Sequence, residues 1–180
     1  MTDDERLQHF MTELHEEFPD FAIVEKTADP LSQAIDVALR VITLNRMTTY
    51  MTHFHTVIGD TLYVPPGWKS TAPRDKVVTL RHERIHLRQR RRLSFIGMAV
   101  IYLLLPLPLF LAYGRARLEW EAYAETIRAT LELHGREAAR SPMLREHILR
   151  QFTSANYGWM WPFRRQLERW YDAELRALGL

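Results

Sequence analysis

The stretch RHERIHLRQRRR, residues 81–92, is the part of the sequence from which the fold can be worked out. It contains the pattern His-Glu-x-x-His, formed by His82, Glu83 and His86. Apolar residues accompany the histidines, and the segment predicts a helix over residues 74–92. Residues four apart lie on one face of a helix, so the two imidazoles can reach the same ion.

The composition limits what kind of site this helix can carry. The 180 residues, 47% of them hydrophobic, are enough for one globular domain with its own core, and we expect a single domain over 1–180. The chain contains no cysteine, which excludes thiolate ligands, a cysteine nucleophile and disulfides. Any metal must therefore be held by histidine and carboxylate side chains.

The sequence before this helix predicts a small sheet. We expect helices over 3–18 and 30–41, a strand over 21–25, and a hairpin with strands near 48–57 and 61–64. His53 and His55 would share the polar face of the first hairpin strand. An exposed strand of this kind can bind an extended peptide by strand addition.

The sequence after it predicts further helices, over 109–134, 142–152 and 162–178. The predicted fold class is α+β, with a small mostly antiparallel sheet, an active-site helix and a predominantly helical C-terminal half. Within the single domain, we expect N-terminal helices and hairpin over 1–72, metal-site helices over 73–134 and a helical cover over 135–180.

A third ligand is expected on the helix that contains RARLEWEAYAETI, residues 115–127. At about 100° per residue, Glu121 and Glu125 fall on a charged face of this helix. Glu119 falls on another flank, among uncharged neighbours, where a carboxylate needs a cation as its partner. Glu119 is therefore the predicted ligand, and Glu121 is the alternative.

Zinc chemistry explains why these residue types would occur together. Zinc lowers the pKa of a bound water, and a nearby carboxylate takes the proton as the water attacks a carbonyl. The pattern predicts that His82, His86 and Glu119 bind Zn²⁺ and that Glu83 is the general base. A protein with these residues in these roles would be a zinc-dependent hydrolase.

The segment SANYGWMWPF, residues 154–163, has two interpretations. Hydrolysis of a carbonyl compound requires a donor to the oxyanion, and Tyr157 is the predicted donor, with Asn156 a weaker candidate. The alternative is that the segment is structural. In that case its aromatic residues, with Trp170 and Tyr171, pack as a latch on the preceding helices.

These residues together resemble the gluzincin clan of zinc metallopeptidases. Glu119-Trp-Glu121-Ala122-Tyr123 is similar to the clan's E-x-E-A-D pattern, in which the first Glu binds zinc and the Asp supports the site from outside. Tyr123 stands here in place of that Asp. The form HExxHxxQ, with Gln89, also resembles small metallopeptidase-like proteins of bacteria and phages. The resemblance covers residues 48–127 and implies zinc-dependent hydrolysis of a peptide or protein substrate.

Residues 95–113 contain no charged side chain and are preceded by a basic run. A single membrane crossing would separate His86 from Glu119, and Pro106 and Pro108 interrupt the segment. Two interpretations remain. The segment is a buried helix that turns back at the prolines, or it is an apolar hairpin that dips into a membrane surface.

Partners and location are predicted from charge. The basic run is interpreted as the solvated side of the helix, so no nucleic acid partner is expected. The N-terminus MTDDERLQHF does not resemble a signal peptide, which predicts a cytoplasmic protein, with membrane-surface association as an alternative. The alternative function is a non-catalytic or membrane-surface binding protein on a metallopeptidase scaffold that uses the basic run and the apolar hairpin.

Overall fold

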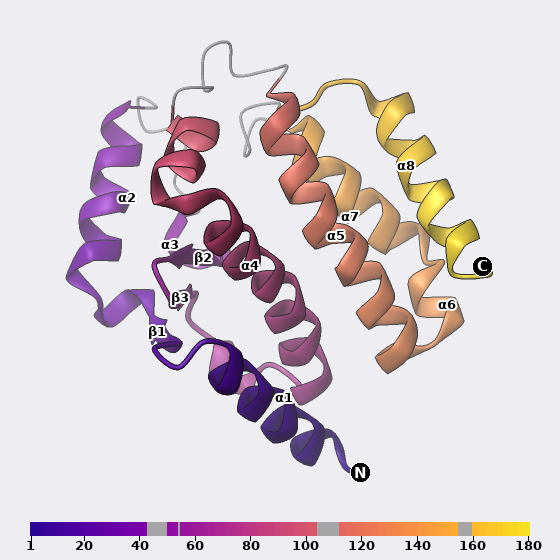
Figure 1. Cartoon of the computed structure of the whole chain (residues 1–180), viewed down its shortest axis with the longest axis horizontal. Helices are drawn as coiled ribbons and strands as arrows, with labels where there is room; N and C mark the ends of the chain where they lie inside the picture. Colours follow the sequence, from indigo (N-terminus) through magenta and orange to yellow (C-terminus); the bar gives the residue numbers. More distant parts are fainter. Residues whose placement is uncertain (43–49, 54, 104–111, 155–159) are drawn as a thin grey trace. The chain divides into compact units, whose positions relative to one another are not determined.

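The computed structural model describes residues 1–42, 50–53, 55–103, 112–154 and 160–180 (Figure 1). They form two compact units, Met1–Val77 and Val78–Leu180, which are described separately. The fold is α+β, as predicted, with a three-stranded sheet in the first unit and helices in the second. That residues 1–180 act as one domain stays a prediction.

The first unit combines helices with a small mixed sheet. Its elements are α1 (Asp3–Glu17), β1 (Ala22–Glu25), η1 (Lys26–Ala28), α2 (Pro30–Ile42), α3 (Tyr50–His53), β2 (Thr56–Ile58), β3 (Thr61–Val64) and η2 (Trp68–Ser70). The strand order is β1-β3-β2, with β1 parallel and β2 antiparallel to β3. The sheet is therefore mixed and not mostly antiparallel. The chain passes through α2 before it reaches the hairpin, and such a crossover allows β1 to pair in parallel.

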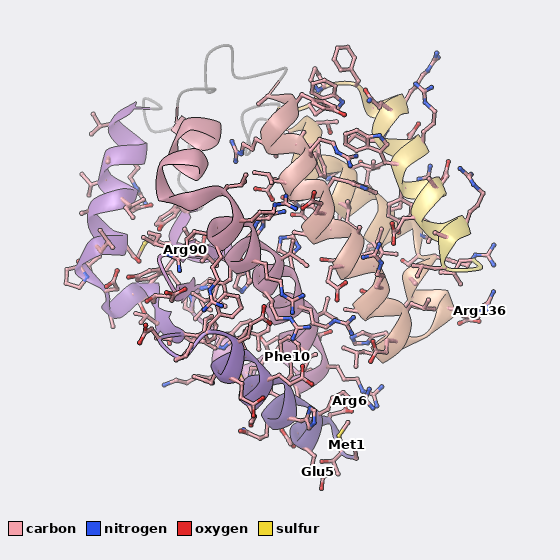
Figure 2. All side chains as sticks on the ribbon, in the orientation of Figure 1. Met1, Glu5, Arg6, Phe10, Arg90 and Arg136 are labelled. Atoms are coloured by element: carbon pink, nitrogen blue, oxygen red, sulfur yellow. The ribbon has the colours of Figure 1, made fainter. Side chains whose placement is uncertain are left out.

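Local sequence signals explain where these elements begin and turn. Thr2 and Glu5 form a capping box at the first turn of α1, where Glu5 is labelled in Figure 2. The Asp29 carboxylate accepts a hydrogen bond from the Ser32 backbone N–H at 2.6 Å, which caps the start of α2 as predicted. Gly59, in the turn between β2 and β3, has a φ of +63°, which only glycine adopts without strain.

The first hairpin strand is shorter than predicted. Tyr50–His53 forms a helical turn, and only Thr56–Ile58 pairs with β3. The two histidines therefore do not share a strand face, because His53 lies in α3 and His55 precedes β2. The His55 ring instead packs edge-on against Trp68, with 5.4 Å between ring centres.

A buried lysine contacts the chain on both sides of this shortened strand start. The Lys26 ammonium donates to the Tyr50 carbonyl oxygen and to Thr56 Oγ1, both at 3.0 Å, and lies 3.6 Å from the centre of the Tyr50 ring. Alternating sequence alone does not reveal such a contact, because its donor lies 24 residues away.

The environment of His55 predicts an acid-sensitive first unit. Burial, with a further contribution from the Lys26 charge, lowers the pKa of His55 from 6.5 to about 4. Below pH 6.5 the unfolded chain takes up a proton at His55 that the folded chain does not. The free energy of unfolding should therefore fall by about 2 kcal/mol from this group between pH 7 and pH 5.

Denaturant unfolding of metal-free protein at the two pH values measures this effect. His55→Gln should lack the His55 contribution, whereas His9→Gln, at an exposed α1 position, should keep it. Equal pH dependence in wild type and His55→Gln would contradict the lowered pKa.

The second unit consists of helices in the order predicted, with one short helix, α6, that was not predicted. α4 (Pro73–Leu103) begins in the first unit and continues into the second, followed by α5 (Tyr113–His134), α6 (Arg136–Ala139), α7 (Pro142–Thr153) and α8 (Arg164–Ala177). α4 continues as far as Leu103, into the uncharged segment. Pro106 and Pro108 lie outside the described residues, so the turn expected there stays a prediction. Across the described residues, no helix combines the length and hydropathy needed to cross a bilayer.

The core of the second unit lies between α5, α7 and α8 (Figure 1). Trp120, Tyr123 and Ile127, from the predicted apolar face of α5, are buried there. Trp161 and Tyr171 join the same cluster, in agreement with the structural interpretation of the C-terminal aromatic residues. Phe163 is an exception, since it is 49% exposed, and Trp159 lies outside the described residues.

Candidate metal centre

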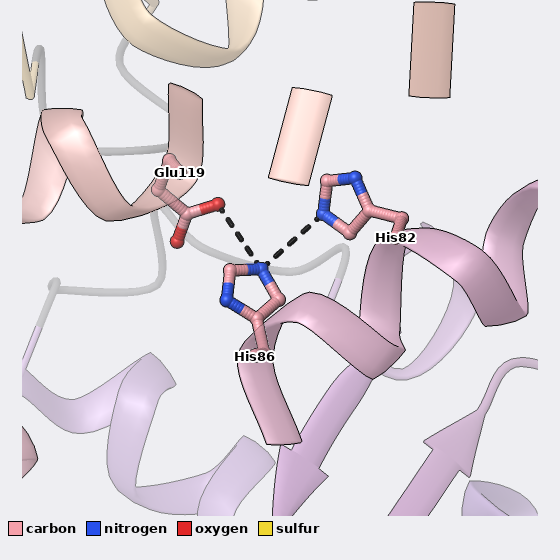
Figure 3. Close-up of side chains that lie close together, drawn as sticks. All are labelled: His82, His86 and Glu119. Atoms are coloured by element: carbon pink, nitrogen blue, oxygen red, sulfur yellow. Dashed lines mark hydrogen bonds and ion pairs between the residues drawn. The ribbon is translucent and has the colours of Figure 1, made fainter. Parts of the chain in front are cut away.

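Three side chains predicted as metal ligands lie together in the second unit. His82 and His86 extend from α4 and Glu119 from α5, with the carboxylate directed towards the His86 ring (Figure 3). His86 Nε2 lies 3.3 Å from His82 Nε2 and 3.6 Å from Glu119 Oε2. One ligand atom from each residue falls within 4.8 Å of the other two, so one cation could contact all three.

The orientation of the His86 ring is set by Gln89. The Gln89 Nε2 group donates to the Leu118 carbonyl oxygen and to Glu121 Oε2, both at 2.9 Å. Both partners are acceptors only, so the amide cannot be flipped without two repulsive contacts. Gln89 Oε1 therefore faces His86 Nδ1 at 3.0 Å and must accept its hydrogen. This leaves the lone pair of His86 on Nε2.

The His82 ring is held in the same tautomer by a threonine. His82 Nδ1 lies 2.9 Å from Thr126 Oγ1, whose hydroxyl hydrogen goes to the Ala122 carbonyl oxygen at 3.2 Å. When the hydroxyl donates to Ala122 it accepts from Nδ1–H, and the His82 lone pair is then on Nε2. Tyr123, which stands in place of the clan's Asp, packs edge-on against His82 with ring centres 4.7 Å apart.

The spacing of the ligand atoms fits a tetrahedral zinc ion. Two lone pairs that face each other across 3.3 Å repel unless a proton or a metal ion lies between them. Two imidazole nitrogens, each about 2.0–2.1 Å from tetrahedral Zn²⁺, stand about 3.3–3.4 Å apart, and a carboxylate oxygen stands at about 3.3–3.5 Å from either nitrogen. The observed 3.3 Å between the two nitrogens agrees with this arrangement, and the 3.6 Å from His86 Nε2 to Glu119 Oε2 is slightly longer.

Glu121 and Glu125, the other acidic residues considered on α5, have different partners. The Glu121 side chain is 40% exposed, against 10% for Glu119, and lies 3.7 Å from the Arg92 guanidinium as well as bonding Gln89. Glu125 does not lie on a solvent-exposed face, because its side chain is largely buried and pairs with Arg81 at 2.6 Å. The structure thus brings Glu119, rather than Glu121, to the histidines.

Arg81, the residue before His82, connects α4 to α5. Its guanidinium contacts Glu125 at 2.6 Å and Glu132 at 2.5 Å. Burial alone would lower the pKa of Arg81, but its hydrogen bonds to Glu132 and Glu125 raise the pKa, so the group stays charged. The first arginine of the basic run is therefore an interhelical contact, and the interpretation of a solvated face does not apply to it.

The two predicted catalytic residues are placed differently. Glu83 is buried, with 7% of its surface exposed, at the position that follows His82. Tyr157 and Asn156 lie outside the described residues, so the oxyanion donor stays a prediction. Sequence reasoning missed Thr126 and the role of Gln89. Their signals were the helical flank that Thr126 shares with Glu119 and the i+3 spacing of Gln89 from His86.

Comparisons with known proteins leave the function to be argued from this geometry. The chain matches no protein-family model, no curated protein and no solved structure. The likeness to gluzincins therefore rests on the residues of the pattern itself. What these residues can do chemically depends on the arrangement of His82, His86, Glu119 and Glu83.

Proposed function

We propose that the chain is a zinc-dependent metallopeptidase that hydrolyses peptide bonds in a peptide or protein. The observation that carries the proposal is the placement of the two imidazole Nε2 atoms 3.3 Å apart, beside the Glu119 carboxylate. Three protein ligands leave one position of a tetrahedral ion open, which catalytic zinc sites require and structural sites lack. His82, His86 and Glu119 would hold the ion.

Zn²⁺ at this position would acidify a water molecule and polarise a peptide carbonyl. Glu83 follows the ligand His82 and is buried, so it is the carboxylate assigned to take the proton from the attacking water. As the new C–O bond forms and the C–N bond breaks, Glu83 passes this proton to the departing amine. The roles require a carboxylate, and glutamine at this position would not perform them.

Zinc binding is the first expected result. Protein freed of metal with EDTA should take up one Zn²⁺ per chain, measured by elemental analysis and by competition with a chromogenic chelator. His82→Ala should lose this binding, because it removes one of three ligands. His9→Ala, on α1 and paired with Glu13, is the matched control and should bind zinc like wild type.

Hydrolysis is tested with the same preparations. A denatured protein mixture is incubated with zinc-loaded and metal-free protein, and new peptide termini are identified by mass spectrometry. Zinc-dependent cleavage is expected. Failure of wild type to bind zinc, or wild-type binding by His82→Ala, would refute the metal site. Zinc binding without any cleavage would instead favour a binding protein on a metallopeptidase scaffold.

A further inference from the structure

We propose that Gln89 and Glu121 are positioning residues that fix the ligands of α4 relative to the ligand of α5. The inference rests on the proposed zinc site, because it assigns a purpose to residues around that site. Neither residue needs to contact the metal. Gln89 would act through His86, and Glu121 would act through Gln89.

Gln89 links the two helices at the level of the ligands. It is almost fully buried, with 3% exposed, and its amide makes three hydrogen bonds, two as donor and one as acceptor. One bond goes to the ligand His86 on its own helix. The other two go to α5, to the Leu118 carbonyl next to Glu119 and to the Glu121 carboxylate two positions beyond Glu119. The ligand on α5 is thus anchored on both sides.

Glu121 determines which way the Gln89 amide points. Its Oε2 accepts from Gln89 Nε2 and lies 3.7 Å from Arg92 Nη2, so a charge at the surface is connected to the buried amide. Without an acceptor at position 121, Gln89 would keep one of its two bonds to α5. Its Oε1 would then be less firmly directed at His86 Nδ1, and the lone pair of His86 would no longer be confined to Nε2.

The contacts of Gln89 with α5 lie outside the buried apolar cluster of α5, α7 and α8. The buried cluster of the second unit draws its described members from residues 112–171, and none of those members comes from α4. Gln89, Arg92 and Arg81 make polar contacts between α4 and α5 near the ligands. Polar bonds therefore help to set the distance between the ligands on α4 and the ligand on α5. Removal of the bonds of Gln89 should lower the affinity for zinc.

The inference predicts a coupled loss of zinc affinity. Gln89→Ala and Glu121→Ala should each raise the zinc dissociation constant by about 10–100-fold, the range found for residues that orient metal ligands. In the double variant the loss should be little greater than in Gln89→Ala alone, because Glu121 acts through Gln89. Glu121→Gln keeps an acceptor oxygen for Gln89 and should bind zinc like wild type.

Glu132→Ala is the matched control for this comparison of single and double variants. Glu132 is also on α5 and also bonds α4, but through Arg81 and away from Gln89. Its effect should be small and should add in full to that of Gln89→Ala. The surface position of Glu121 keeps the test available even if Gln89→Ala does not fold.

A second measurement separates this inference from the proposed function. ¹⁵N NMR of the imidazole side chains in metal-free protein should show His86 with its hydrogen on Nδ1 in wild type and a tautomer mixture in Gln89→Ala. An unchanged tautomer and unchanged zinc affinity in Gln89→Ala would overturn the inference, as would full additivity of Gln89→Ala and Glu121→Ala. A wild-type protein that binds no zinc refutes the proposed function, while the tautomer result still decides the role of Gln89.

Discussion

Glu83→Gln is expected to keep zinc bound and to lower the rate of peptide hydrolysis by about 10²–10⁴-fold, the usual contribution of a general acid–base residue. The substitution preserves size and hydrogen-bonding capacity but cannot take a proton from water. Because Glu83 is not one of the three side chains that lie together, zinc affinity should stay within a few-fold of wild type. Activity and metal content are therefore expected to separate in this variant.

The test uses a peptide that wild type cleaves, with kcat and KM determined at saturating zinc. Glu137→Gln, at an exposed position of α6, is the control and should retain full activity. If Glu83→Gln binds zinc and still hydrolyses the peptide at the wild-type rate, Glu83 is not the base. If the variant loses zinc, the carboxylate belongs among the ligands and the assignment of roles is wrong.

Most helices of this chain could be predicted from sequence because their signals are local. Apolar spacing locates α1, α5 and α7, and Asp29 with Pro30 marks the start of α2. The sheet could be predicted only in part. The pairing of β1 with β3 joins residues about forty positions apart, and no local pattern encodes its parallel direction.

The site shows the same division between local and distant information. Two signals are properties of single helices: the pattern at His82 and His86, and the uncharged flank on which Glu119 lies. Both could be recognised from the sequence. The side chains that bond the imidazoles of His82 and His86 could not be predicted in the same way. Thr126 bonds the His82 ring, and Gln89 bonds Leu118 and Glu121, only because α4 and α5 lie in one register, which depends on contacts such as that of Arg81 with Glu125.

The second large effect is expected from Glu119→Gln, which should raise the zinc dissociation constant by about 10²–10³-fold. Zinc binding in small zinc domains amounts to roughly 10–16 kcal/mol, so each of four ligands contributes about 2.5–4 kcal/mol. A neutral amide oxygen is a much weaker ligand than a carboxylate. Glu121→Gln is the matched variant two positions along the same helix, and its zinc affinity should stay within a few-fold of wild type.

Competition with chelators of graded affinity measures both constants, and zinc-edge X-ray absorption reports the ligands that remain. Glu119→Gln should lose an oxygen ligand and Glu121→Gln should not. The opposite result, with Glu121→Gln the weaker binder, would require α5 to present Glu121 to the histidines, and the Gln89–Glu121 bond at 2.9 Å would have to break. The ring tautomer of His86 would then change as well, because Gln89 would lose the acceptor that helps to direct its Oε1. The two matched variants therefore test the ligand set and the register of α4 and α5 together.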